Sequence, residues 1–344
     1  MHIFPFESNL PINRLAACFN NTSATYKFYW LLAILDTVQE NRKDIGKLEL
    51  FVRMISNAWY TVNYFHVSFG QQDLIQDTVR RLKDIEGIRI DEQKASIILR
   101  LMASNRPETR KLLFHFDKNV PHWFLSPWYP KTDKNTIYQL SQDNTGEPLY
   151  HLYKDSIVIN DRWFAYLTRH VRIIRDYIYW NLALFLQVRN PNVPDIPNKL
   201  IKPAMRNSLL KQRKFWDFVI DVNGPLTCIY TGRELFKGRY HVEHFIPYSF
   251  VSHDQIWNLI PADNSFNLTK NNKLPQLDRY FESFYALQEL AIKTYLTNNP
   301  RERMLEDYFY IGTDLKEGVS KEKFFDVVNP LVTIASNNGF EFLP

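Results

Sequence analysis

The chain of 344 residues is longer than one domain of about 100–200 residues, and its 45% hydrophobic residues exclude a wholly disordered protein. With 10 glycines and 15% aromatic residues, the composition favours helices over a turn-rich all-β fold. The 42 basic and 37 acidic residues leave a net charge of +5, which permits nucleic-acid binding through a local patch without demonstrating it.

Cys18 and Cys228 are the two cysteines of the chain, too few for a disulfide framework. No signal sequence with a charged, an apolar and a small-residue part opens the chain. The longest apolar runs, such as Tyr29 to Leu35, fall short of the roughly 20 residues that cross a bilayer. We therefore expect a soluble cytoplasmic protein with no membrane partner.

The first hundred residues predict helices, because apolar side chains recur at i, i+3, i+4 and i+7. Gly87 and the Arg106-Pro107 pair mark two helix ends. The apolar positions are Phe28, Leu31, Leu32 and Leu35; Ile75, Val79 and Leu82; and Ile97, Ile98, Leu101 and Met102. Residues 1–145 are thus expected to be a helical N-terminal domain for recognition or partner binding.

Residues 117–132, DKNVPHWFLSPWYPKT, combine three prolines with Trp123, Trp128 and Tyr129. Proline at this density predicts irregular structure. Two interpretations stay open. The segment is either a connector whose rings pack onto the helical core or an aromatic loop that stacks on bases.

Residues 146–222 are expected to form a hairpin and long basic helices. Weak alternation over Tyr150–Asn160 predicts the hairpin. A helix follows from Asp161 to about Val188, and the cluster at residues 190–192 ends it. Four arginines of this helix form either a basic stripe or an ordinary solvated face. They are Arg162, Arg169, Arg172 and Arg175.

The segment 198–214 carries six basic residues and no acid: Lys199, Lys202, Arg206, Lys211, Arg213 and Lys214. It is either a solvated helix or an approach to a nucleic-acid site that contacts phosphates. Its position directly before the motif-bearing segment favours the second interpretation. Lys211, Arg213 and Lys214 are therefore predicted to bind substrate.

Residues 226–275 carry the polar motifs of the sequence. Leu226–Tyr230 and Arg239–Phe245 predict two strands, and Ser265–Asn272 suits a short helix. Asp254, in the loop between the second strand and this helix, is expected to cap a helix. The motifs are Glu243-His244-Phe245-Ile246-Pro247, Asn258-Leu259-Ile260-Pro261 and Asn267-Leu268-Thr269-Lys270.

In this register the segment resembles the HNH endonuclease family, whose ββα-metal module reads acid-His-x-x-Pro, then Asn-Leu-x-Pro, then Asn-x-x-Lys. The resemblance covers about fifty residues, and the ordered combination is far more specific than any single motif. Together with the helical patterns above, it predicts a mainly α chain, in which a helical N-terminal domain accompanies a small HNH nuclease module, residues 223–280, flanked by helices. Residues 281–344 are expected to be C-terminal helices that pack on the nuclease, with Phe284, Leu287, Ala291 and Tyr295 at helical spacing.

These residue types suit phosphodiester hydrolysis. His244 is the candidate general base, since an imidazole with a pKa near ~6.5 is largely neutral at pH 7. Glu243 and Asn267 offer oxygen ligands to a divalent ion, Mg²⁺ or Mn²⁺. By resemblance, Asn258 belongs to the catalytic set and ties the loop through side-chain hydrogen bonds. Lys270, by the same resemblance, faces a substrate phosphate or steadies the site.

Two features depart from the family pattern. The acid before the histidine is commonly Asp, and Glu243 is one methylene longer, which leaves the position of the ion open. Many relatives also hold the hairpin with a CxxC zinc ribbon, whereas Cys228 is followed three residues later by Thr231. Packing must then hold the hairpin, and the candidate rings are Tyr230, Phe236, Phe245 and Trp257.

We therefore expect a metal-dependent endonuclease that hydrolyses phosphodiester bonds of DNA, with RNA left open as a substrate. The resemblance implies a role in restriction or anti-phage defence, with protein partners of a defence system. The alternative is a catalytically inactive nucleic-acid-binding or scaffold protein that keeps the HNH fold.

Overall fold

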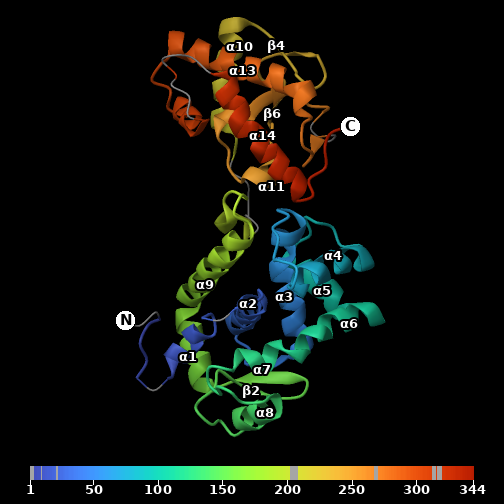
Figure 1. Ribbon diagram of the computed structural model, residues 1–344, viewed down its shortest axis with the longest axis vertical. Helices are drawn as coiled ribbons and strands as arrows, with labels where there is room; N and C mark the ends of the chain where they lie inside the picture. Colours follow the sequence, from blue (N-terminus) through green and yellow to red (C-terminus); the bar gives the residue numbers. More distant parts are fainter. Residues whose placement is uncertain are drawn as a thin grey trace. The chain divides into compact units, whose positions relative to one another are not determined.

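The computed structural model describes residues 4–8, 10–20, 22–201, 208–266, 270–311, 315 and 320–344. The chain divides into two compact units (Figure 1): residues 1–191 with 196–202, and residues 192–195 with 203–344. This division differs from the four predicted segments, because the hairpin and the long helix pack with the N-terminal helices. Among the described residues, no helix has the length and apolar character needed to span a bilayer.

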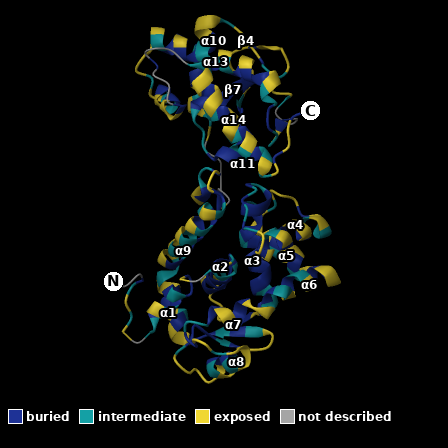
Figure 2. Cartoon of the chain, viewed as in Figure 1, coloured by how far each residue is buried: buried dark blue, intermediate teal, exposed yellow. Residues whose placement is uncertain are grey.

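The helices of the first unit pack around α3, which is buried over most of its length (Figure 2). The predicted helices are confirmed, and Gly87 ends α4 in the left-handed conformation, with φ of 58°. The helices are α1 (Ile12–Ala17), α2 (Tyr26–Gln39), α3 (Lys47–Asn63), α4 (Leu74–Glu86), α5 (Lys94–Ala103), α6 (Pro107–Phe114), η1 (His115–Lys118), α7 (Val120–Phe124), α8 (Lys134–Gln142), α9 (Asp161–Arg189) and η2 (Ile196–Lys199).

A three-stranded antiparallel sheet lies in the same unit, with the order β1-β3-β2. Strands β2 (Tyr150–Leu152) and β3 (Ser156–Ile159) confirm the predicted hairpin, and β1 (Asp44–Gly46) adds an edge that the sequence pattern did not indicate. The buried ammonium of Lys47 fixes this sheet to α3, since it donates to the Lys154 carbonyl of the hairpin and to Asp117, both at 2.8 Å.

The proline-rich segment 117–132 packs into the core instead of forming an open loop. Trp128 and Tyr129 are buried and donate to the carbonyls of Glu147 and Thr145, whereas Trp123 is half exposed. The connector interpretation is therefore supported for most of the segment, although η1 and α7 make it more regular than expected. Three arginines of α9 are also engaged in ion pairs, which disfavours the basic-stripe interpretation: Arg162 with Glu147, Arg169 with Glu7, and Arg175 with Asp36.

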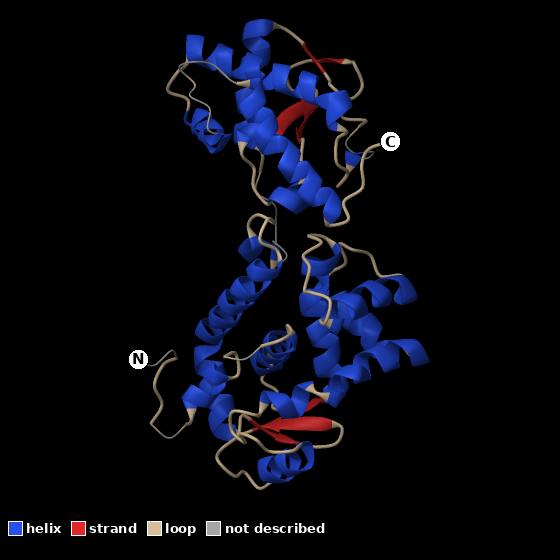
Figure 3. Cartoon of the chain, in the orientation of Figure 1, coloured by secondary structure: helices blue, strands red, loops and turns tan. Residues whose placement is uncertain are grey.

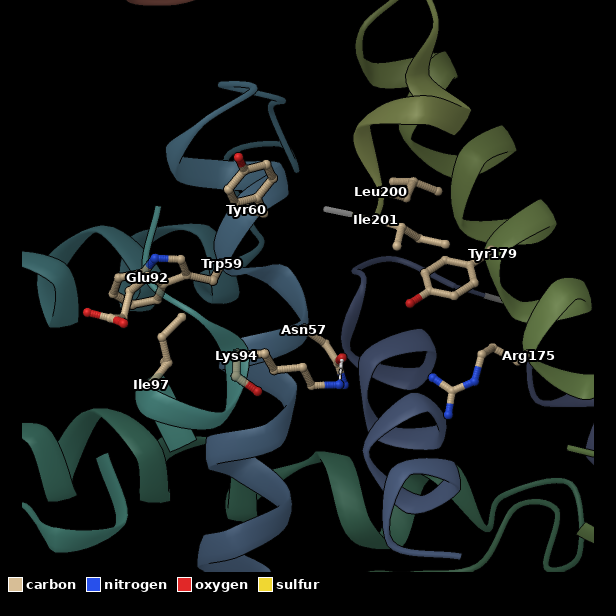
Figure 4. Close-up of a pocket in the computed structure, with 11 residues that line it drawn as sticks. Asn57, Trp59, Tyr60, Glu92, Lys94, Ile97, Arg175, Tyr179, Leu200 and Ile201 are labelled. Carbon is tan, nitrogen blue, oxygen red and sulfur yellow. Dashed lines mark hydrogen bonds between the residues drawn. The ribbon is translucent and has the colours of Figure 1, made fainter. Parts of the chain in front are cut away.

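A cleft of about 340 Å³ opens in the first unit among α3, α5 and α9 (Figure 4). Its walls include aromatic side chains of Trp59, Tyr60 and Tyr179. Two residues that line the cleft, Lys94 and Arg175, donate to Asp36 of α2 at 2.6 and 3.0 Å, so that this carboxylate joins three helices. Burial opposes ionisation of Asp36, but these two cations prevail and hold its pKa below the ordinary 3.8.

The second unit surrounds short strands with helices (Figure 3), and the predicted mainly helical fold is confirmed. Its elements are α10 (Leu210–Asn223), β4 (Leu226–Thr227), β5 (Glu234–Leu235), β6 (His241–His244), α11 (Tyr248–Val251), η3 (Ile256–Asn258), β7 (Leu259–Ala262), α13 (Leu277–Asn298), η4 (Arg303–Ile311) and α14 (Lys321–Asn337). Three residues of the helix predicted over Ser265–Asn272, residues 267–269, lie outside the described residues.

The pairing of the strands corrects the predicted hairpin. Strand β4 pairs with β5, because the tight turn around Gly232, with φ of 71°, returns the chain within a few residues. Strand β6 pairs instead with β7, in the register His244↔Leu259 and His241↔Ala262. Strand β7 is buried on both faces and shows no alternation, which hid it from the sequence pattern.

Helices α10 and α13 pack against β7 and hold it in place. The indole of Trp216 and the amide of Gln288 both donate to the Leu259 carbonyl, at 3.1 and 3.0 Å. Phe245 stacks on Phe284 of α13 with ring centroids 3.8 Å apart, as expected for C-terminal helices packed on the module. Tyr230 and Trp257 also pack as predicted, whereas Phe236 is 48% exposed and does not hold the hairpin.

Candidate active site

Strand β6 carries the carboxylate and the imidazole on consecutive residues. Successive side chains of a strand point to opposite faces, so Glu243 and His244 have different surroundings. The carboxylate of Glu243 lies 3.4 Å from the ammonium of Lys270. The imidazole of His244 contacts Asp254 and packs edge-on against Tyr248, at 5.5 Å between ring centroids.

The imidazole of His244 is almost buried, with 7% of the side chain exposed. Its Nε2 lies 3.0 Å from Oδ1 of Asp254, within hydrogen-bond distance. The expectation that Asp254 caps a helix is wrong, since Gln255 precedes η3 and no side-chain cap bond forms there. Ser252, with φ of 59°, turns the chain so that the carboxylate faces the imidazole. Sequence reasoning missed this contact, because no periodic pattern links the two positions.

Glu243 is paired with a lysine that the solvent does not reach. Lys270 was predicted to bind substrate or to steady the site, and its side chain is 0% exposed. Burial lowers the pKa of Lys270, and the nearby Glu243 carboxylate opposes that shift. In this structure, Lys270 is therefore a partner of Glu243, with its ammonium enclosed beside the carboxylate.

Asn258 makes the loop-tying bonds that the resemblance implied. Its amide Nδ2 donates to the Ile246 carbonyl and its Oδ1 accepts from the Ile246 N–H, both at 2.8 Å. Asn258 itself is 0% exposed. The two bonds hold the chain after β6 against the start of β7. A direct catalytic role for Asn258 stays a prediction.

The candidate ligand atoms are oxygens. They suit a hard divalent ion that keeps some of its waters better than a metal that protein side chains surround completely. Asn267, the second predicted ligand, lies outside the described residues. Among the described residues, those around Glu243 included, no three His, Cys, Asp or Glu side chains gather into a group that could hold a metal. Glu243 alone supplies a carboxylate, and Mg²⁺ commonly binds one or two carboxylates while keeping waters and substrate phosphates. The residues therefore fit such an ion.

The predicted substrate-binding residues Lys211, Arg213 and Lys214 lie in α10, at the edge of the site. Lys211 and Lys214 are exposed, and the Arg213 guanidinium lies 5.3 Å from the centre of the Tyr240 ring. Gln212 of the same turn donates to the Asp254 carbonyl, which joins α10 to the loop beside His244. Of the earlier part of the basic run, Lys199 is buried in the first unit, and Lys202 and Arg206 lie outside the described residues.

Comparison with known proteins agrees with this geometry. Residues 228–276 match the family described as HNH endonuclease. No curated protein and no solved structure matches the chain. The matched stretch runs from the end of β4 to the residue before α13 and includes Glu243, His244, Asn258 and Lys270. This segment of the second unit is therefore similar to the HNH endonuclease family.

Proposed function

We propose that the chain is a metal-dependent endonuclease that hydrolyses phosphodiester bonds of DNA. The observation that carries the proposal is a nearly buried imidazole, held at Nε2 by a carboxylate, next to Glu243 on one short strand of an HNH module. His244 then has one ring nitrogen engaged and the other, Nδ1, available as a base.

In the proposed reaction, Nδ1 of His244 takes a proton from water as the water oxygen attacks phosphorus. The bond from phosphorus to the 3′ oxygen breaks, and the departing oxygen takes up a proton from solvent. A neutral imidazole can accept the first proton as a general base.

Glu243 and Asn267 are the residues proposed to hold a divalent ion, Mg²⁺ or Mn²⁺. Such an ion, when bound, stabilises negative charge on the phosphate and on the leaving oxygen. Exposed Lys211 and Lys214, together with Arg213, are proposed to contact phosphates along the strand. Lys270 acts on this site through Glu243, since its ammonium is enclosed there.

The test is cleavage of supercoiled plasmid by the full chain with Mg²⁺ or Mn²⁺. His244→Ala is expected to lower the rate at least ~10²-fold, because it removes the general base. His241→Ala is the matched control, since His241 is an exposed histidine of the same strand. Equal nicking by the wild type and His244→Ala would refute the assignment. Single-stranded DNA and RNA in parallel reactions identify the substrate.

One observation favours a second function, in which the module binds nucleic acid without cutting it. The Lys270 ammonium lies beside the one described carboxylate that is available to a metal. Calorimetric titration with Mn²⁺ separates the two functions. Binding that weakens in Asn267→Ala supports the nuclease, and absence of metal binding supports the inactive protein.

A role in restriction or anti-phage defence, with protein partners from such a system, completes the proposal. It rests on the HNH module alone. Cells that express the wild-type chain are expected to form fewer plaques on phage challenge than cells that express His244→Ala. Equal plaque numbers would contradict the defence role and leave the nuclease assignment intact.

A further inference from the structure

We propose that Asp254 is a positioning residue that sets the orientation and tautomer of the His244 imidazole. This inference rests on the proposed nuclease function. The contact joins Nε2 of His244 to Oδ1 of Asp254 at 3.0 Å. An ionised carboxylate only accepts hydrogen bonds, so the neutral ring must carry its hydrogen on Nε2. The lone pair then lies on Nδ1, the nitrogen assigned to receive the proton of water.

The loop that carries Asp254 is fixed on both sides. The side chain of Gln212 donates to the Asp254 carbonyl at 3.0 Å. Two residues further on, the Ile256 N–H donates to Asp307 Oδ2 at 2.8 Å. The carboxylate is thus brought to the imidazole by contacts from α10 and η4 and does not depend on a flexible surface side chain.

The surroundings of the His244–Asp254 hydrogen bond further restrict the orientation of the imidazole. The side chains of His244 and Asp254 are 7% and 20% exposed, so water competes little for the hydrogen bond. The edge of the Tyr248 ring packs against the imidazole and restricts its rotation further. Loss of a carboxylate that orients a metal-ligating imidazole costs about 10- to 100-fold in metal affinity or activity, and we expect a loss of the same order for this general base.

The first experiment measures kcat and KM of the full chain on plasmid. Asp254→Ala is expected to lower kcat about 10- to 100-fold while KM stays within about twofold. Asp254→Asn is the second variant, in case the alanine protein fails to fold. Asp278→Ala is the matched control, because Asp278 is an exposed aspartate at the start of α13 in the same unit. An unchanged kcat for Asp254→Ala, or an equal loss for Asp278→Ala, would overturn the inference.

A double variant distinguishes positioning from a general loosening of the module. If Asp254 acts through the imidazole, His244→Ala with Asp254→Ala is no slower than His244→Ala alone. A further loss in the double variant would assign Asp254 another role.

A second measurement does not need activity. Nitrogen-15 NMR of the histidine rings near pH 8 is expected to show the Nε2–H tautomer for His244 in the wild type and a mixture in Asp254→Ala. If the wild-type chain does not cleave nucleic acid but the tautomer of His244 still differs between the wild type and Asp254→Ala, the nuclease proposal is refuted and the positioning contact is supported. An unchanged tautomer refutes the contact itself.

Discussion

Replacing Asn258 with alanine tests whether this residue maintains the fold of the module. The side chain makes two bonds of 2.8 Å to the backbone of Ile246, and both residues are 0% exposed. Alanine leaves the N–H and the carbonyl of Ile246 buried without these partners. Each unsatisfied group costs about 1–3 kcal/mol, so the free energy of unfolding of the second unit should fall by about 2–6 kcal/mol.

Hydrogen exchange of peptides around Ile246, measured by mass spectrometry under native conditions, reports this loss for the second unit alone. The chain has two units, and a single melting curve would mix their transitions. Asn264→Ala is the control, because Asn264 is an exposed asparagine of the same module and should change stability by less than about 0.5 kcal/mol. A loss below about 1 kcal/mol for Asn258→Ala would refute the structural role. A lowered kcat at unchanged stability would assign the residue to catalysis instead.

Two further variants test charge interactions in the two units. Lys270→Met should tighten Mn²⁺ binding at least about fivefold in a calorimetric titration, because the variant removes a cation 3.4 Å from Glu243; unchanged or weaker binding would show that the lysine does not compete with the metal. Asp36→Asn should destabilise the first unit by about 2 kcal/mol at pH 7, since it removes the carboxylate from Lys94 and Arg175. The pKa of Asp36 lies below its ordinary 3.8, so its stabilisation is present above that value and is lost as the pH falls through the folded pKa. The difference from the wild type should therefore shrink between pH 7 and pH 3, and an equal difference at both would contradict the ionised network.

Local signals in the sequence predicted much of the fold. Helix α9 was expected from Asp161 to about Val188 and runs from Asp161 to Arg189, because its apolar stripe, cap and terminating cluster all lie within the segment. The hairpin of β2 and β3 follows from the same kind of local pattern. The order of the HNH motifs located the module, and the family match confirms it.

Contacts between residues that lie far apart in the sequence could not be predicted from local signals. Strand β7 was not expected, because Leu259–Ala262 is buried throughout and lacks the alternation of a half-exposed strand. Lys270 appears in the sequence as an ordinary basic residue of a motif. Its burial against Glu243, 27 positions earlier, depends on how the chain folds back over β6. The charge of a residue and its spacing in the sequence do not indicate that its side chain is buried away from water.

The contacts of the motif residues separate those that maintain the fold of the module from those proposed to act on the substrate. Asn258 directs its whole amide to the backbone of Ile246, and Lys270 directs its ammonium to Glu243. In the proposed reaction, the chemistry is then left to His244 and Glu243, with Asn267 as the predicted second ligand. Asp254, which no motif marks, completes the hydrogen bonding of the imidazole. An HNH sequence that kept every motif residue but lacked this carboxylate would keep the frame while its histidine lost a fixed orientation. The Asp254–His244 contact therefore supports the proposed nuclease activity by an observation that is independent of the motif.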